Sequence, residues 1–352
     1  MDKKGLVAVV HHFRVEKKGY TLHPITQGFI NDTFLVFEGA KPQYILQRIN
    51  RDVFANVPGL MGNMEKALAF LKHNGYRSFR LVRTSSGGTY YESASGHCWR
   101  LMTYIDHSIV YDTTTKKEVA FEAGRIIGKF HELLEEANPD DFVDTIPRFH
   151  DLAFREQQFN KAFSDCALLR RDTATQAIQF ANGMLMKLKR WDPEDLPSRI
   201  CHNDTKLNNI LFSKDSHKAI CLLDLDTLMK GYFHFDFGDA VRTIVNTAPE
   251  DEKEHDNIIF DKELFEAFVT GLGTSAGFLT QQEKEVLPFG AVLLPFLHGL
   301  RALTDYLNGD VYYKVAYEDQ NLDRCLSLFS FTTKVMEQLD YMRDVISTKL
   351  NC

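Results

Sequence analysis

The sequence predicts an α+β protein of two lobes, in which a small antiparallel sheet with one helix precedes a larger, mainly helical lobe. Three observations lead to this prediction. The first third of the 352-residue chain holds short runs of strand-forming residues around a single helical pattern. The rest is dominated by helical periodicity, and the change near residue 112 has no flexible-linker composition. A chain of this length also exceeds the usual size of one domain.

The predicted N-terminal lobe, residues 1–102, consists of strand pairs and one helix. Its strands are short β-prone runs separated by glycine-containing turns. Its helix is expected from Leu60 to Lys72, where apolar residues recur at helical spacing. Strands are expected at 34–38, 44–49 and 98–105, with turns at 39–42 and 85–88.

A short hinge, residues 103–112, is predicted to lead into the C-terminal lobe, residues 113–352. The first helix of this lobe would open at Thr113 and carry one apolar stripe that includes Ile126 and Phe130. Two short apolar runs within residues 200–227 predict a hairpin set among helices. Further helices are expected near 154–168, 172–189, 261–274, 282–308 and 318–346.

The composition argues against some classes of partner. The formal net charge is −7 and no run of five or more Lys or Arg occurs, so we expect no nucleic-acid partner. The longest apolar stretch, Phe289 to Leu300, contains a proline and a histidine, so we expect no membrane-spanning segment. Six scattered cysteines without metal-ligand spacing are typical of reduced thiols. We therefore expect a cytoplasmic protein.

The most informative segment runs from His202 to Asn209 and continues at Asp224. Phosphoryl transfer needs a carboxylate that orients and deprotonates the attacking hydroxyl, and oxygen ligands that hold Mg²⁺ against the phosphates. The spacing H-x-D-x-x-x-x-N supplies Asp204 and the amide of Asn209 from one loop. Asp224, 20 positions after Asp204, supplies a second carboxylate, and Lys206 could reach the transferred phosphate.

An ordinary turn is the alternative interpretation, because Asp and Asn side chains often bond their own backbone. The full pattern H-x-D-x-K-x-x-N, followed by strand, turn, strand and D-x-D, is far more specific than H-x-D alone. A second candidate carboxylate, Asp236, lies 32 residues after Asp204, too far for the hairpin that returns a metal ligand. We interpret Asp236 as a helix-start residue whose carboxylate accepts backbone N–H bonds of the catalytic loop.

These motifs resemble those of the aminoglycoside phosphotransferase and choline kinase superfamily. The matching stretches are 28–33, 44–47, 201–211, 224–227, 235–239 and 301–312, which together span nearly the whole chain. The resemblance implies a bilobal, protein-kinase-like fold and a small-molecule kinase that uses ATP and Mg²⁺. Within the superfamily the pattern is most similar to the N-acetylhexosamine 1-kinases, which implies transfer to the anomeric hydroxyl of N-acetylglucosamine or N-acetylgalactosamine.

The resemblance also implies the roles of individual residues. Residues 102–105 would meet the adenine, and Glu65 would occupy the position of the glutamate that pairs with a strand lysine. Arg301 and Tyr312 would contact the sugar, although an arginine on a long helix is also commonly a salt-bridge partner. The implied roles are Asp204 as base; Asn209 and Asp224 as magnesium ligands; Gly28, Gln47, Glu65, Thr103, Ile105 and Lys206 at the nucleotide; Asn31, Arg301 and Tyr312 at the sugar; and His202 and Asp236 as supports.

Two positions depart from the superfamily pattern. Gln47 stands where most of these kinases place a lysine or arginine for the α- and β-phosphates, which favours the N-acetylhexosamine subgroup. The phosphate loop has a single glycine, Gly28, and is not G-x-G-x-x-G. Phe29 beside it replaces an expected polar residue, so the sugar contacts of this loop stay open.

Other acceptors for the same machinery remain open. They are aminoglycosides, choline, homoserine and methylthiopentoses. An aminoglycoside would call for acids near Asp204, which Glu250, Asp251, Glu252 and Glu254 could supply. A pseudokinase that only binds nucleotide is the alternative from another class, and the presence of Asp204, Asn209 and Asp224 together argues against it.

Overall fold

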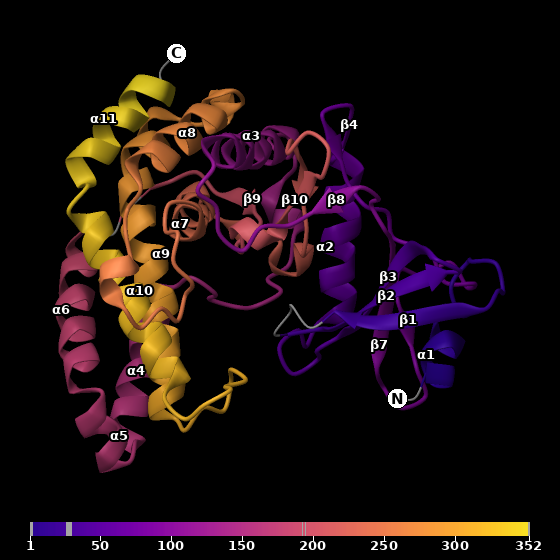
Figure 1. Cartoon of the computed structure of the whole chain (residues 1–352), viewed down its shortest axis with the longest axis horizontal. Helices are drawn as coiled ribbons and strands as arrows, with labels where there is room; N and C mark the ends of the chain where they lie inside the picture. Colours follow the sequence, from indigo (N-terminus) through magenta and orange to yellow (C-terminus); the bar gives the residue numbers. More distant parts are fainter. Residues whose placement is uncertain (1–2, 26–29, 192, 194, 351–352) are drawn as a thin grey trace.

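The computed structural model describes residues 3–25, 30–191, 193 and 195–350, which form two lobes (Figure 1). The smaller lobe holds a five-stranded antiparallel sheet with the order β1-β2-β3-β7-β6. Its strands are β1 (Tyr20–Ile25), β2 (Asp32–Glu38), β3 (Lys41–Ile49), β6 (Tyr91–Glu92) and β7 (Cys98–Thr103). A two-stranded ribbon, β4 (Lys72–His73) and β5 (Tyr76–Arg77), follows the helix of this lobe.

Alternation along the strands gives the sheet two different faces. Leu46 on β3 and Leu101 on β7 are fully buried against helix α1 (Lys3–Val10), in a small core with Val36 and Trp99. The next residue along β3 and the preceding one on β7, Gln47 and Arg100, lie opposite each other on the other face. The side chains of that face line the space between the lobes.

Helix α2 (Val57–Phe70) lies between the sheet and the second lobe (Figure 1). The Asn56 side chain accepts from the backbone N–H of Gly59 at 2.9 Å and caps its first turn, where Pro58 also stands. Its buried face includes Leu60, Met64 and Ala67, which join the main core of the protein.

Two short sheets in the second lobe carry the loops that face the first. Strands β10 (Ile210–Ser213) and β11 (Ala219–Leu222) form a hairpin that β8 (Ser108–Ile109) extends. Strands β9 (Arg199–Cys201) and β12 (Met229–Gly231) pair with each other. Because β8 lies within residues 103–112, part of the predicted hinge already belongs to a sheet of the second lobe.

Helices make up the rest of this lobe. Their bounds are α3 (Lys117–Leu133), α4 (Leu152–Asp165), α5 (Leu168–Thr173), α6 (Thr175–Trp191), α7 (Phe233–Ile244), α8 (Lys262–Gly273), α9 (Gln281–Leu307), α10 (Gln320–Met336) and α11 (Leu339–Leu350). Short 3₁₀ turns span Pro139–Asp141, Leu207–Asn209, Leu225–Thr227, His255–Asn257 and Ala276–Phe278. Helix α9 contacts α4, α6, α7, α10 and α11 and is the centre of the lobe.

Helix α9 begins with a capping box formed by Thr280 and Glu283. It is long and apolar enough to cross a membrane by length and composition, but 89% of its apolar window is buried inside the protein, as in a core helix. Two glycines bring α7 directly against it. A Cβ atom on Gly238 would overlap the carbonyl oxygen of Gly290, and one on Gly290 would overlap that of His234.

The predicted antiparallel sheet followed by a mainly helical lobe is confirmed, with three corrections. Helix α1 was not predicted, and it covers the outer face of the sheet. The helix expected over 318–346 is two helices, because α10 ends at Met336 and α11 starts at Leu339. The helix expected to open at Thr113 begins at Lys117, and Thr114 instead accepts from the Lys116 backbone N–H at 3.0 Å.

Candidate active site

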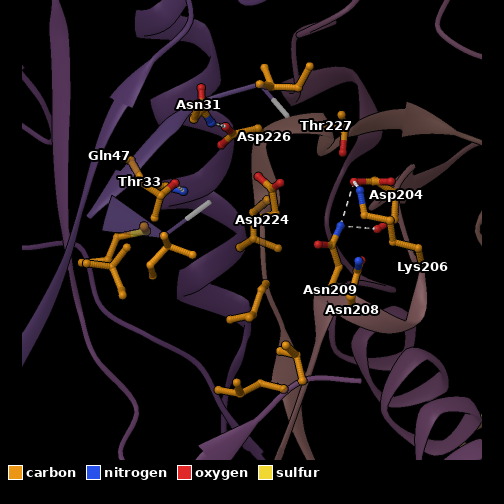
Figure 2. A pocket seen from close by; sticks show the side chains of 18 of the residues that line it. Asn31, Thr33, Gln47, Asp204, Lys206, Asn208, Asn209, Asp224, Asp226 and Thr227 are labelled. Atoms are coloured by element: carbon orange, nitrogen blue, oxygen red, sulfur yellow. Dashed lines mark hydrogen bonds and ion pairs between the residues drawn. The ribbon is translucent and has the colours of Figure 1, made fainter. Parts of the chain in front are cut away.

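A cavity of about 550 Å³ lies between the two lobes. Strands β2, β3 and β7 line one side, and the loops after β9 and β11 line the other. Figure 2 shows Thr33 and Gln47 facing Asp204 and Asn209 across this space, with Asp224 between them. The volume is in the range of small-molecule sites.

Asp236, which is fully buried in the first turns of α7, supports the loop after β9. Its carboxylate accepts from the backbone N–H groups of His202 at 2.8 Å and Asn203 at 2.6 Å, and it contacts His131 Nε2 at 2.8 Å. These are the backbone hydrogen bonds expected for a supporting residue. Asp236 is also absent from the described lining of the cavity, unlike Asp224.

His202 supports the same loop from its side chain. Its ring nitrogen Nε2 lies 2.7 Å from the carbonyl oxygen of Leu223, which directly precedes Asp224. Asn203 adopts a left-handed backbone with φ of 61°, a conformation that Asn tolerates better than most residues. Its amide donates to the carbonyl oxygens of Cys201 and Thr227. The loops that carry Asp204 and Asp224 are therefore joined by hydrogen bonds.

Asp204 has one oxygen engaged and one open. Lys206 Nζ lies 2.9 Å from Oδ2, and Asn209 Nδ2 donates to the same oxygen at 2.7 Å. Within the described chain, the side-chain partners of Asp204 all contact Oδ2, which leaves Oδ1 for a further proton donor. Burial alone would lower the pKa of Lys206, but the adjacent Asp204 carboxylate raises it, so the ammonium stays charged.

Asn209 and Asp224 form a donor set that suits a hard cation. Because the Asn209 amide nitrogen donates to Asp204, its oxygen is the atom left for a ligand, and Figure 2 shows that oxygen turned towards Asp224. Carboxylate and amide oxygens are the ligands that Mg²⁺ prefers. Across the described residues no cluster of three or more His, Cys, Asp or Glu has metal-site geometry, so any metal here would also need ligands from a substrate.

Both the backbone conformation and the negative charge of Asp224 are unfavourable. Its backbone is left-handed, with φ of 55°. Burial, together with the neighbouring carboxylates of Asp226 and Asp204, raises the pKa of Asp224 to about 6, although Arg100 and Lys206 oppose this shift. Crowding of three acids in one cleft is the arrangement that a divalent cation would relieve.

The hinge end of the cavity is apolar. Thr103 and Ile105 both line it, together with Ile45, Met102 and Leu211. The backbone N–H of Thr103 donates to Arg80 at 2.9 Å, and that of Tyr104 donates to Gln43 at 2.9 Å, which fixes the turn out of β7.

One buried arginine at this site was not anticipated from the sequence. Arg100 on β7 is 1% exposed, and its guanidinium donates to Gln47 Oε1 from Nε at 2.9 Å and from Nη2 at 2.6 Å. Its third nitrogen forms an ion pair with Asp226, which Asn31 Nδ2 also contacts at 2.6 Å. The only local signal is a charged residue between Trp99 and Leu101 in an otherwise apolar strand.

The side-chain amide of Asn31, which was predicted to bind the sugar, already has hydrogen-bond partners within the protein. Its oxygen accepts from the Asn50 backbone N–H at 2.9 Å while its nitrogen contacts Asp226. It lines the cavity, but both ends of its amide already have partners. Its role at the substrate therefore stays a prediction.

Arg301 and Tyr312 both line the cavity and lie close to each other. The Arg301 guanidinium lies 4.9 Å from the ring of Phe149 and 5.9 Å from that of Tyr312. Among the described residues Arg301 makes no hydrogen bond or ion pair, so the salt-bridge interpretation does not apply. A neighbouring pair repeats the arrangement, because Arg324 lies 4.6 Å from the ring of Tyr313.

The four acids considered for an aminoglycoside do not line the described part of the cavity. Glu250 pairs with Arg242 and Arg324, and Asp251 accepts from Gln320 at 3.0 Å. Glu252 accepts from the Glu254 backbone N–H at 2.9 Å. Glu250 and Asp251 therefore pair with residues of α10 instead of lining the cavity.

Two predicted nucleotide residues are not brought to the described cavity. Glu65 follows the buried Met64 by one position on α2, so it points outwards, where it pairs with Arg83 in a separate shallow hollow. Its role at the nucleotide therefore stays a prediction. Gly28 lies outside the described residues.

Comparisons with known proteins agree with this architecture. A sequence model of the phosphotransferase enzyme family, APH, matches residues 21–270. A microcompartment-associated aminopropanol kinase has a similar structure, with a TM-score of 0.67 and 17% identity over 97% of this chain and 98% of that one. A choline kinase from Cryptosporidium parvum gives a TM-score of 0.58 and 13% identity over the full length of both chains.

A third similar structure is an amicoumacin kinase solved with AMP-PNP, Ca²⁺ and Ami. Its TM-score is 0.60 and its identity 13%, over 99% of this chain and 94% of that one. At such identities these likenesses show the fold, and the expected kinase-like fold of this superfamily is confirmed. Since the family model covers more than half of the sequence, the chain belongs to the phosphotransferase enzyme family.

Proposed function

We propose that the protein is a cytoplasmic kinase that uses ATP and Mg²⁺ to phosphorylate the anomeric hydroxyl of N-acetylglucosamine or N-acetylgalactosamine, giving the sugar 1-phosphate. The observation that carries the class of acceptor, a neutral molecule rich in oxygen atoms, is Arg301. It lines the same cavity as Asp204, stacks on Phe149 and Tyr312, and has no ion-pair partner among the described residues.

The open oxygen of Asp204 would accept the proton of the sugar hydroxyl. The hydroxyl oxygen then bonds to the γ-phosphorus, and the bond from that phosphorus to the oxygen bridging to the β-phosphate breaks, so that ADP leaves. Lys206, beside Asp204, carries a positive charge near the transferred group. Asn209 and Asp224 would hold Mg²⁺, which neutralises the phosphate oxygens.

Positive charge at the acceptor end disfavours cationic acceptors. Two arginines, the unpaired Arg301 and the Glu250-paired Arg324, line the cavity, and a third, Arg155, lies close to them. Burial and the charge of Arg301 lower the pKa of Arg155 to about 10. The pKa of Tyr313 is also lowered, because the three guanidinium groups outweigh its burial. Choline, an aminoglycoside or another amine would have to enter against this field.

A neutral, oxygen-rich acceptor suits the same residues. Hydroxyl and acetamide oxygens accept hydrogen bonds from a guanidinium, and the C–H face of a sugar ring packs on an aromatic side chain such as Tyr312. The N-acetylhexosamine itself and its anomeric position rest on the motif resemblance, including Gln47 and the stretch 301–312.

The test follows ATP consumption and reducing ends together. The purified protein is incubated with Mg-ATP and N-acetylglucosamine, N-acetylgalactosamine, choline, homoserine, a methylthiopentose or kanamycin. Loss of reducing ends in step with ATP consumption supports a 1-kinase, with Asp204→Asn as the inactive control. Constant reducing ends during consumption would refute the anomeric position. Consumption with only a cationic acceptor would refute the proposed acceptor class.

A further inference from the structure

Among the described residues, the N-terminal lobe contributes no unpaired cationic side chain to the lining of the cavity. The cationic side chains of the lining are Lys206, Arg301, Arg324 and Arg100. The first three come from the second lobe, and Arg100 is buried against Gln47 and Asp226. A phosphate chain reaching from the apolar hinge end towards Asp204 and Asp224 would pass strands β2 and β3, so it must be met there by neutral donors.

Arg100 determines which way the Gln47 amide points. A guanidinium has only donors, so the atom that faces it must be the amide oxygen, and two of its nitrogens donate to Gln47 Oε1. The amide nitrogen is thereby turned the other way. Nε2 donates one hydrogen to Thr33 Oγ1 at 3.0 Å. Its second hydrogen has no acceptor within the described part of the chain.

Thr33 completes a small donor surface. Because its hydroxyl oxygen accepts from Gln47, its own hydrogen is directed to another acceptor. Both side chains line the cavity, and Figure 2 shows them on the side facing Asp224. Two N–H or O–H groups on adjacent strands therefore point to one region, and the positive charge of Arg100 behind the amide strengthens the Gln47 donor.

We propose that Arg100 is a positioning residue that fixes the Gln47 N–H, with the Thr33 hydroxyl beside it, towards the nucleotide phosphates. In this arrangement the cation stays in the protein, paired with Asp226, and the phosphates meet a polarised amide instead of an ammonium group. The inference rests on the proposed use of a nucleotide but not on the identity of the acceptor.

Calorimetric titration of the full chain with Mg-AMP-PNP and, separately, with adenosine tests this. Gln47→Glu keeps the shape and lets the new carboxylate accept both Arg100 hydrogen bonds, so the fold is preserved. It removes the donor and adds a negative charge, and AMP-PNP binding should weaken at least tenfold. Gln47→Met removes the donor without adding charge and should weaken it about tenfold, as for one lost hydrogen bond to a charged group. Adenosine affinity should stay within twofold in both variants.

Two further variants separate this role from a structural one. Gln43→Glu makes the same charge change on β3 outside the described lining and should leave both affinities within twofold. Arg100→Lys keeps the charge but cannot hold Gln47 with two nitrogens, so it should weaken AMP-PNP more than adenosine. AMP-PNP affinity within twofold of wild type in both Gln47 variants, or an equal loss for adenosine, would overturn the inference.

The outcome is distinguishable from failure of the proposed function. Wild-type protein that binds no AMP-PNP would overturn both the inference and the kinase proposal. Normal AMP-PNP binding with the expected losses, combined with no turnover of amino sugars, would overturn only the acceptor.

Discussion

Two arginines of the same cavity differ in what surrounds them. Arg100, on strand β7, is almost fully buried, and each of its nitrogens has a partner in Gln47 or Asp226. Arg301, on helix α9, stacks on aromatic rings and has no described ion pair or hydrogen bond. The first charge is balanced inside the protein and the second is not. The residue type alone therefore does not tell which role an arginine has.

The largest expected effect is on catalysis. Asp204→Asn removes the proposed proton acceptor, and kcat should fall by about 10²–10⁴-fold, the span of general base catalysis. AMP-PNP affinity should change little, which calorimetry can check. A variant with near-normal kcat would remove Asp204 from the mechanism.

Removing the buried, ion-paired Arg100 should affect folding first. Arg100→Met leaves the Asp226 carboxylate buried without its partner, and the free energy of unfolding should drop by about 3–5 kcal/mol. Urea denaturation followed by circular dichroism measures this. The double variant Arg100→Met/Asp226→Asn, which buries no lone charge, should recover most of the loss. Equal stability of the single variant and wild type would contradict the buried ion pair.

Removing the unpaired Arg301 should affect use of the acceptor and not the stability of the fold. Arg301→Met should lower kcat/KM for the acceptor by about 10–100-fold, the loss of one or two hydrogen bonds from a charged donor. The KM for ATP should be unchanged, and the free energy of unfolding should stay within about 0.5 kcal/mol. If the unfolding energy falls as far as in Arg100→Met, the two arginines do not differ as described.

The smallest effect concerns how stability depends on pH through the neighbouring acids Asp204, Asp224 and Asp226. The pKa of Asp224 is raised from its ordinary 3.8 to about 6, so the folded protein binds more protons than the unfolded chain in that window. Stability without metal or nucleotide is therefore lost as pH rises through it. Asp224→Asn should raise the melting temperature at pH 8 by about 2 °C, roughly the shift that 1 kcal/mol gives in a chain of this size.

That gain should shrink towards zero at pH 4, where the wild-type carboxyl is itself protonated. Differential scanning fluorimetry at pH 4, 6 and 8, with chelator present, measures it. Asp239→Asn serves as the control, because the pKa of Asp239 is lowered and its removal should destabilise the protein. An identical melting difference at all three pH values would show that Asp224 does not titrate in this range.

The residues predicted best are those whose roles depend on local spacing. Asp204, Lys206 and Asn209 lie within one loop, and Asp224 follows one hairpin later, so a pattern of 23 positions was enough to bring them together. Asp236 could be separated from Asp224 by the same reasoning. The fold class followed from periodicities that repeat within each element.

The residues missed depend on partners far along the chain. Arg100 reads as an isolated charge until Asp226, 126 positions later, is seen beside it. Glu65 was assigned by analogy with the partner of a lysine that this chain lacks; the apolar face of α2 turns it away from the described cavity lining, and its role at the nucleotide stays a prediction. Helix α1 is eight residues long and lacks an acidic first turn or a basic last turn, so only its packing on the sheet reveals it.

The glycine contact between α7 and α9 has a consequence for motion. Asp236 on α7 holds the loop of Asp204, while α9 carries Arg301, and the two helix backbones touch at Gly238 and Gly290 with no room for a side chain. Asp204 and Arg301 therefore belong to one stiff body. If the lobes open, the sheet with Gln47 would move while Asp204 and Arg301 keep their geometry. In the proposed kinase, turnover would then bring the phosphate donor to an acceptor site that is already in place.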